Sequence, residues 1–580
     1  MSAISWLSAR TKGAEPLGPW SSTASEAPSW ARAFAVAMLV ALALTALSGV
    51  GLAFTYAPSS ASAWGSVYFT EYVLGSGWYV RSLHVAATES MIVLGVVALV
   101  LAAVEGRYRG KRDLAFYAQA LVLALALALC ITGNPLRWDN RGYYGLLVET
   151  NIAGELPGGK LLRALALGGS EPSSFTLTRL YALHTLLLPL AIVGLLSLWL
   201  RSARAASRDE PGPPPEVRDL SAQLARDAAL AAMTIAAVAI FAWVSRAPLE
   251  APADPVAAYN ARPEWYFSSL YLLRNLVPAK MQSIVAGGTP VVVGAIVAAL
   301  PFLDRDAAAP ASKRAPKIAL LVVPVLAALA LTLLAVRHDA RDVELAKART
   351  AQAKLARRAL QVARASGIPP AGALAMMRSD PITHAEDLFR EKCASCHKLG
   401  DMGPPDGKLT APSLDGFGTA AWAIAVMEDP DAPTLFGNTA YKGRMPSMTK
   451  PPADPAMAKD FTAMKKEDVA AIAAFLAGEA AESPTAIEGA KLVKQRCTSC
   501  HLFRGATDDD VGYAPELAGW GSTAWMRAQI GNPGTNATYR PIALSAALEG
   551  HMPRYDLELS AADVDLLARF VRQRGQRGER

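Results

Sequence analysis

The pentapeptides Cys393-Ala-Ser-Cys396-His397 and Cys497-Thr-Ser-Cys500-His501 decide the fold of the C-terminal part of this chain. Two thiols at this spacing can form thioethers to one haem, and the histidine that follows becomes the proximal iron ligand. The chain has only five cysteines and seven histidines, so chance clustering is a poor explanation. A zinc site needs about four such ligands, and no further cysteines complete one. We therefore predict two covalently bound haems c.

A methionine follows each motif and can supply the distal iron ligand, as in cytochromes with Met/His ligation. Met445-Pro446 lies downstream of the first motif, and Met552-Pro553 lies downstream of the second. The shared Met-Pro dipeptide favours Met445 and Met552 as ligands. Met448 in the first half and His551 in the second half stay as alternatives.

The two haem motifs belong to a tandem repeat. The segment Ala411-Pro-Ser-Leu-Asp-Gly-Phe-Gly-Thr-Ala-Ala-Trp422 is similar to Ala514-Pro-Glu-Leu-Ala-Gly-Trp-Gly-Ser-Thr-Ala-Trp525. Self-similarity at one offset indicates duplicated domains rather than one larger fold. We expect two small helical domains of the class I cytochrome c type, at residues 381–480 and 485–580.

The preceding part of the chain contains long uncharged runs of about 20 residues, the length that crosses a bilayer. A buried helix of a soluble protein can imitate one such run, but not seven. We therefore predict an all-α chain in which a seven-helix membrane bundle precedes the haem domains. The runs lie at roughly 31–56, 82–104, 114–134, 179–200, 227–245, 284–303 and 318–336.

The basic residues of short loops predict the orientation of this bundle, because such loops stay on the cytoplasmic side. Arg107–Arg112 follows the second run, and Arg305–Lys317 follows the sixth. Both loops are expected on the cytoplasmic side of a bacterial inner membrane. The N-terminal segment 1–30 is then cytoplasmic, the first run acts as an uncleaved signal, and residues 337–580 lie on the periplasmic side, where haem is attached. The net charge of +7 indicates no nucleic-acid partner.

Two histidines, His84 and His184, lie inside the runs. An ionisable side chain within the membrane indicates a functional site. Both histidines lie near the outer ends of their runs and at similar depth. We predict that their imidazoles hold one non-covalent haem b.

The membrane part contains six further motifs: Thr45–Pro58, Gly77–His84, Trp138-Asp139, Thr178–His184, Pro252–Pro255 and Pro263-Glu-Trp-Tyr-Phe267. Together they resemble the motifs of cytochrome b from respiratory quinol:cytochrome c reductase. The resemblance covers about residues 30–336, and Arg137 stands where that family has proline. Residues 31–226 are similar to its four-helix N-terminal part, and residues 227–336 are similar to subunit IV of the photosynthetic relatives.

The resemblance implies a quinol pocket on the outer face beside the haem. Glu264 would take a quinol proton, and Tyr266 would shape the pocket. Arg81 and Arg179 would pair with haem propionates, because guanidinium groups bind carboxylates in a bidentate manner. Gly49 and Gly133 stand at positions where the family has glycines that let the backbone approach the edges of the outer haem. The family has a second pair of such glycines at the inner haem. The other partners that the resemblance implies are membrane lipid, a Rieske iron–sulfur protein, a further electron acceptor and a second copy in a larger complex.

The inner haem of that family has no ligands here. The family has a second histidine about fourteen residues beyond each first one, or roughly 21 Å along the helix. Those positions are Ala98 and Leu198 in this chain, and the inner glycine positions are Ala35 and Gln119. We therefore expect one haem b, and a Q cycle that cannot run in the ordinary way. Quinol oxidation is then linear, or a partner subunit supplies the missing step.

The expected function is that of a quinol:cytochrome c oxidoreductase subunit that fuses cytochrome b, subunit IV and a dihaem cytochrome c. The linker 337–380 is alanine-rich and charged, and we expect a solvated helical stalk that tethers the haems c near the membrane donor. The alternative is a membrane-anchored electron conduit in which the b-part has lost quinol chemistry. The intact Pro-Glu-Trp-Tyr segment at 263–266 favours the enzyme.

Overall fold

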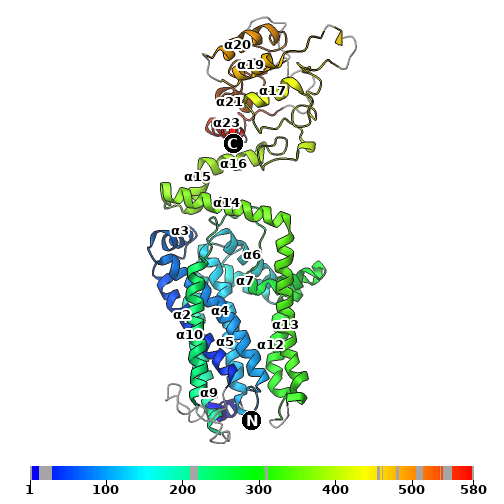
Figure 1. Cartoon of the computed structure of the whole chain (residues 1–580). Helices are drawn as coiled ribbons and strands as arrows, with labels where there is room; N and C mark the ends of the chain where they lie inside the picture. Colours follow the sequence, from blue (N-terminus) through cyan, green and yellow to red (C-terminus); the bar gives the residue numbers. More distant parts are fainter. Residues whose placement is uncertain are drawn as a thin grey trace. The chain divides into compact units, whose positions relative to one another are not determined.

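The chain folds into two compact units, Met1–Met377 and Arg378–Arg580, seen in the computed structural model (Figure 1). Regular secondary structure in the described residues is helical, with isolated β-bridges only, which confirms the all-α prediction. The residues that the structure describes are 3–11, 29–209, 220–306, 311–452, 458–459, 461–478, 483–503, 514–535, 537–539 and 552–577.

In its described residues, the first unit contains seven helices that are long and apolar enough to span a membrane, as predicted. The fourth span begins with α8 (Ser174–Ala182) and continues through a π-helical turn, η5 (Leu183–Leu187), into α9 (Leu188–Asp209). The other spans are α2 (Trp30–Ala53), α4 (Gly77–Val104), α5 (Asp113–Gly133), α10 (Leu220–Val244), α12 (Gln282–Leu303) and α13 (Ala311–Arg341).

Helices α2, α4, α5 and α9 form a bundle whose interior is filled by apolar side chains. Met38, Met91, Val122 and Ile192 come from these four helices in turn and share one buried core. Helix α10 packs against α2 and α4, while α12 and α13 pack together with the short helix α11 (Ser268–Asn275) and contact α5 and α4. Much of the surface of these helices is not covered by other helices. This uncovered surface is apolar, as expected for helices that face lipid.

One end of the unit gathers the basic loops. The short N-terminal helix α1 (Ala3–Thr11) is held there by Arg10, whose guanidinium lies 2.6 Å from the carboxylate of Asp113 at the start of α5. Asp304, at the end of α12, is fully buried and accepts hydrogen bonds from Tyr108 at 2.6 Å and Lys317 at 2.9 Å. The loops predicted to be cytoplasmic therefore lie together at one end of the bundle.

The other end is covered by short helices and by the segment that follows α10. The helices are α3 (Ala63–Tyr68), α6 (Asn140–Glu155) and α7 (Gly159–Leu167), which appear together above the bundle (Figure 1). Trp138 adopts a left-handed backbone conformation with φ of 48°, unusual for a residue other than glycine. Its carbonyl accepts from the amide of Ala253, so the segment after α10 is fixed to this turn.

The linker, which was expected to be a solvated helical stalk, is helical, but it also packs against the first unit. Helix α14 (Val343–Ser366) begins at Asp342, whose side chain caps it, and ends at Gly367, whose φ of 72° breaks the helix. Its residues Ala359 and Val362 share a buried core with Trp64 of α3. One face of the linker therefore belongs to the first unit.

The second unit contains the two halves of the repeat, and equivalent helices in the halves begin in the same way. Asp380 and Ser483 cap the helices that precede the haem motifs, and Thr419 and Ser522 cap the helices that follow them. The helices are α16 (Pro381–Lys392), α17 (Ala420–Glu428) and α19 (Lys466–Leu476) in the first half, and α20 (Pro484–Arg496), α21 (Thr523–Gly531) and α23 (Ala561–Arg577) in the second.

The two cores of this unit do not follow the two halves of the repeat. One core joins α16 to α21 and α23, and the other joins α17 and α19 to α20. The expectation of separate domains at 381–480 and 485–580 describes the duplication in sequence, whereas each packed core takes helices from both halves.

Candidate functional site

His84 on α4 and His184 in the π-helical turn η5 face each other inside the bundle. Their ring centroids are 6.2 Å apart, and the ring planes are inclined at 66°. A metal–imidazole bond is about 2.0–2.1 Å long for zinc, so two rings on opposite sides of one ion have centroids about 6 Å apart. A π-helical turn inserts an extra residue and is frequent at functional sites. The spacing fits one haem iron held by two histidines.

Backbone carbonyls orient both imidazoles. The Nδ1 of His84 lies 3.0 Å from the carbonyl oxygen of Thr45, and the Nδ1 of His184 lies 3.0 Å from that of Leu129. Since a carbonyl only accepts, each Nδ1 carries the proton and donates. The Nε2 atoms are then left unprotonated and could bind a metal, which is the arrangement expected around ligating histidines.

Gly49 and Gly133 give these imidazoles their room. A Cβ added at Gly133 would lie 2.6 Å from the Cε1 of His184, and one added at Gly49 would lie 3.1 Å from the Cε1 of His84. Their predicted role was to let the backbone approach the haem. In the structure they let α5 and α2 approach the histidine rings, so a side chain at either position would displace a ring.

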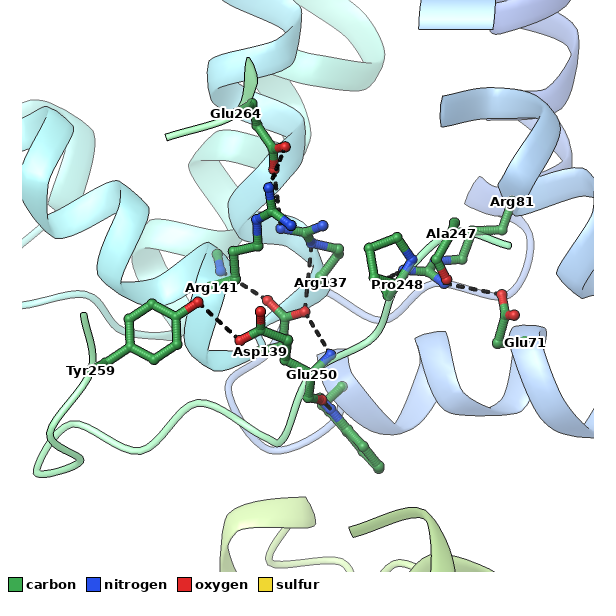
Figure 2. A network of polar contacts seen from close by, with 12 residues as sticks. Glu71, Arg81, Arg137, Asp139, Arg141, Ala247, Pro248, Glu250, Tyr259 and Glu264 are labelled. Carbon is green, nitrogen blue, oxygen red and sulfur yellow. Dashed lines mark hydrogen bonds and ion pairs between the residues drawn. The ribbon is translucent and has the colours of Figure 1, made fainter. Parts of the chain in front are cut away.

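The two arginines predicted to pair with propionates have other contacts in the structure. The buried guanidinium of Arg81 donates to the carboxylate of Glu71 at 3.0 Å and to the carbonyl of Ala247 at 2.8 Å, and it also contacts the carbonyl of Pro248 (Figure 2). Arg179 donates to the carbonyl of Leu165 at 2.7 Å. Their pairing with propionates stays a prediction.

The inner end of the bundle is packed with side chains. Ala98 is fully buried, and a Cβ added at the neighbouring Gly95 would lie 2.9 Å from Leu123 and 3.1 Å from the sulfur of Met38. Gln119 is also buried, and within the described part of the chain its Nε2 has no hydrogen-bond partner. A second haem would have to displace these groups.

Glu264 lies in the loop before the short helix η7 (Trp265–Phe267) and points toward two arginines (Figure 2). One carboxylate oxygen is 2.6 Å from Arg141, and the other is 3.7 Å from Arg137. Arg137 was visible in the sequence only as the residue that replaces the family's proline, and Arg141 gave no signal. The side chain predicted to accept a proton thus lies in an ion pair with Arg141.

Tyr266 joins this loop to the end of α5. Its hydroxyl oxygen accepts from the amide of Asn134 at 3.4 Å, and burial raises the pKa of its hydroxyl. Asn134 directly follows Gly133, which touches His184. The Pro-Glu-Trp-Tyr segment therefore contacts the residue next to the glycine that approaches the ring of His184.

Asp139 fixes the position of the loop that follows α10. It is fully buried, accepts from the amide of Gly142 at 2.8 Å to cap α6, and accepts from the amide of Glu250 at 3.1 Å (Figure 2). Arg137 lies 3.7 Å from the same carboxylate. The Trp138-Asp139 pair thus organises the backbone around the candidate pocket.

Glu149 on α6 is a second carboxyl group of this end of the unit. Burial raises the pKa of its side chain to about 8, and the charge of Glu264 adds to the effect. Its Oε2 atom is buried and has no hydrogen-bond partner among the described residues. A single glutamate in an amphipathic helix looks like an exposed residue in sequence, so this group could not be identified there.

The two haem motifs of the second unit show the same histidine geometry. The Nδ1 of His397 donates to the carbonyl of Pro412 at 2.8 Å, and the Nδ1 of His501 donates to that of Pro515 at 2.9 Å. Burial lowers the pKa of both imidazoles and so favours the neutral form that ligates metals. Each Nε2 is left for iron, so both motifs fit a haem c.

The methionines lie in the two cores. Met552 packs against the core that contains Cys393, whereas Met445 and its alternative Met448 pack against the core that Cys497 adjoins. Each methionine is thus grouped with the haem motif of the other half. His551 lies outside the described residues.

The family comparisons assign the parts of the chain separately. The family model described as cytochrome b/b6/petB matches residues 22–205, and that described as cytochrome b(C-terminal)/b6/petD matches residues 252–352. The model described as cytochrome c matches twice, at 382–478 and 486–575.

Individual relatives agree with these matches. The chain is 30% identical over 145 residues to cytochrome b6 of Gracilaria tenuistipitata var. liui, which covers 25% of this chain and 67% of the relative. It is 26% identical over 294 residues to the cytochrome bc complex cytochrome b subunit of Chlorobaculum thiosulfatiphilum, covering 48% of this chain and 67% of that one. A solved structure titled hyperthermophilic respiratory Complex III gives a TM-score of 0.48 at 22% identity, covering 60% of this chain and 94% of that chain.

Proposed function

Because this chain belongs to the cytochrome b/b6 family and ends in two cytochrome c domains, we propose that its role in membrane electron transfer is to oxidise quinol and pass the electrons to its own haems c. It is the electron-transferring subunit of a quinol:cytochrome c oxidoreductase. One haem b and two haems c serve each chain.

The arrangement of Gly133 and Asn134 carries this proposal. Gly133 touches the ring of His184, and the next residue, Asn134, donates to Tyr266 in the Pro-Glu-Trp-Tyr segment. A quinol beside Tyr266 would therefore lie close to the haem b edge. Haem b, when bound, accepts one electron at a time.

Quinol oxidation also releases two protons, and this end of the unit has carboxyl groups to take them. Glu264 is paired with Arg141 and can accept a proton if that ion pair opens toward the substrate. Glu149 is protonated near neutral pH because burial raises its pKa to about 8, so it can pass a proton on. Tyr266 contributes an apolar ring wall and a hydroxyl for orientation.

The packed inner end of the bundle supports a linear path. Ala98 and Gln119 are buried where the family would hold a second haem. With haem b held by His84 and His184 and a Rieske iron–sulfur partner present, both electrons of a quinol would pass outward, toward the haems c and an external acceptor. The complex is a homodimer in a bacterial inner membrane, with the haems c on the periplasmic side.

Substitution of Glu264 by glutamine tests the proposal. A positioned base contributes about 10²–10⁴-fold to proton abstraction, so Glu264→Gln should slow quinol-driven haem reduction on that scale without changing haem content. Glu344→Gln, on the exposed part of α14, is the matched control. The measurement is stopped-flow reduction of the haems c by a synthetic quinol, with a dithionite spectrum as the reference.

The second candidate is an electron conduit without quinol chemistry, and the 2.6 Å ion pair of Glu264 with Arg141 favours it. In that case the carboxylate only fixes the loop. Unchanged quinol-driven reduction in Glu264→Gln and in a variant that lacks haem b, His184→Ala, would establish this second function in place of the first.

A further inference from the structure

Helices of the second unit pack across the two halves of the repeat. Helix α16 of the first half lies on α23 of the second, where Phe389 and Ala568 are fully buried in the core that includes Cys393. Helix α20 of the second half lies on α19 of the first, and a Cβ added at Gly489 would collide with the carbonyl of Ala471. Both helix pairs that flank the haem motifs are therefore made from different halves.

Polar contacts tie the first haem motif to the second half. The ammonium of Lys392 lies 3.1 Å from the carboxylate of Glu558, and the hydroxyl of Tyr555 donates to the carbonyl of Lys392 at 2.6 Å. The Nε2 of His384 lies 2.8 Å from the carboxylate of Asp563. Lys392 directly precedes Cys393, so these contacts lie at the first haem attachment site.

The chain crosses itself at one pair of equivalent glycines. Gly418 and Gly521 occupy the same place in the repeat, four residues before Trp422 and Trp525. Both have positive φ, of 82° and 70°, and a Cβ added at Gly521 would lie 2.7 Å from the Cα of Gly418. The segments leave their own haem motifs here and enter opposite lobes. An accidental contact between two separate domains would not place equivalent residues at one crossing.

We propose that each haem c is bound by both halves of the repeat, with Met552 as the distal ligand of the haem on His397 and Met445 as the distal ligand of the haem on His501. The inference rests on the proposed covalent haem at both motifs. Met552 packs on the core of Cys393, and Met445 packs with Cys497. Each half thus supplies the attachment motif of one site and the methionine of the other.

Within the second site, Met445 is the ligand rather than Met448. The amide of Met448 donates to the carbonyl of Met427 at 2.7 Å, and its carbonyl accepts from the amide of Met464 at 2.8 Å. These bonds fix Met448 in the wall formed by α17 and the segment before α19. Met445 lies three residues earlier, beside Pro446, and among the described residues no backbone bond of this kind fixes it in the same wall.

Cross-linking of the purified full-length chain tests the exchange of helices. A zero-length carbodiimide should join Lys392 to Glu558 across the halves, and Lys450 to Asp429, 3.3 Å apart within the first half, as an internal standard. Lys392→Arg should abolish only the first product, because arginine does not react. In a mixture of isotopically heavy and light chains, no Lys392–Glu558 product should join a heavy peptide to a light one. The proposal is overturned if the Lys392–Glu558 peptide is missing while the standard is present, or if that peptide joins a heavy chain to a light one.

Ligand assignment is tested in chains that retain one haem c. In Cys393→Ala/Cys396→Ala, only the haem on His501 remains, and Met445→Ala should abolish its methionine–iron charge-transfer band while Met552→Ala and Met448→Ala leave it unchanged. In Cys497→Ala/Cys500→Ala the effects of Met445→Ala and Met552→Ala should be reversed. Loss of the band on substitution of the methionine in the same half as the remaining motif overturns the proposal.

The two tests separate this inference from the proposed function. Mass spectrometry of the unmodified chain counts covalent haems, so a chain without them contradicts the proposed function whatever the cross-links show. Where a single-haem variant does not fold, the cross-link in the unmodified chain still shows whether helices are exchanged between the two halves. A chain with two haems but cross-links confined to each half keeps the function and rejects the exchange.

Discussion

Replacement of Gly133 by alanine should release haem b while leaving the haems c in place. The added Cβ would lie 2.6 Å from the Cε1 of His184, whereas carbon atoms in contact lie about 3.5–4.0 Å apart. The ring must therefore move by about 1 Å. The two imidazoles are only 6.2 Å apart at their centroids, so a shift of that size lengthens or breaks one iron bond. Overpacking of this kind costs about 1–3 kcal/mol, or roughly 5- to 150-fold in haem b affinity.

A graded series gives this prediction its control. Gly49→Ala places its Cβ 3.1 Å from His84, so it should weaken haem b less than Gly133→Ala does. Gly194→Ala on α9 meets no atom within 4 Å and should leave haem b unchanged, with a gain in helix stability of up to about 1 kcal/mol. The assay is the transfer of haem b to excess apoglobin, with the covalent haems c as internal standard. Equal transfer rates in all three variants would refute the reasoning.

Three further predictions concern other groups. A pyridine haemochrome assay should give one haem b for two haems c, and a ratio near 1:1 would indicate an inner haem. Glu149 should show a protonated-carboxyl infrared band that disappears with a midpoint near pH 8, and Glu149→Gln should remove it. Because the folded pKa of Glu149 is raised, the free energy of unfolding should fall as pH rises from about 4.5 to about 8, and the variant should lose this slope. Arg81→Met leaves the carboxylate of Glu71 buried and unpaired, which should destabilise the chain by about 3–5 kcal/mol. Adding Glu71→Gln should restore part of the loss, as measured by thermal unfolding in detergent.

The sequence was sufficient to predict the membrane helices, because long uncharged runs have few alternatives. It also identified His84 and His184, which the structure brings face to face. The ion pair of Glu264 with Arg141 could not be found in this way, since it joins residues from two loops without any shared pattern.

The packing of the second unit could not be predicted from the sequence either. A repeat shows which segments are alike, but α16 is compatible with the packing surface of α19 and with that of α23. The structure places it on α23, and the crossing of Gly418 and Gly521 lies where the two equivalent segments exchange cores. Likewise, the buried face of α14 could not be predicted, because small alanine side chains occur both on solvent-exposed and on buried helix faces.

The pairing of helices across the repeat also sets an order in which the second unit can form. Helices α19 and α20 are neighbours in the chain, so their contact closes only a short loop and can form early. The contact of α16 with α23 joins His384 to Asp563, which are 179 residues apart. The first haem motif in the chain is therefore the last to be enclosed, so the proposed attachment of haem at Cys393 and Cys396 would have the whole synthesis of the second half in which to occur.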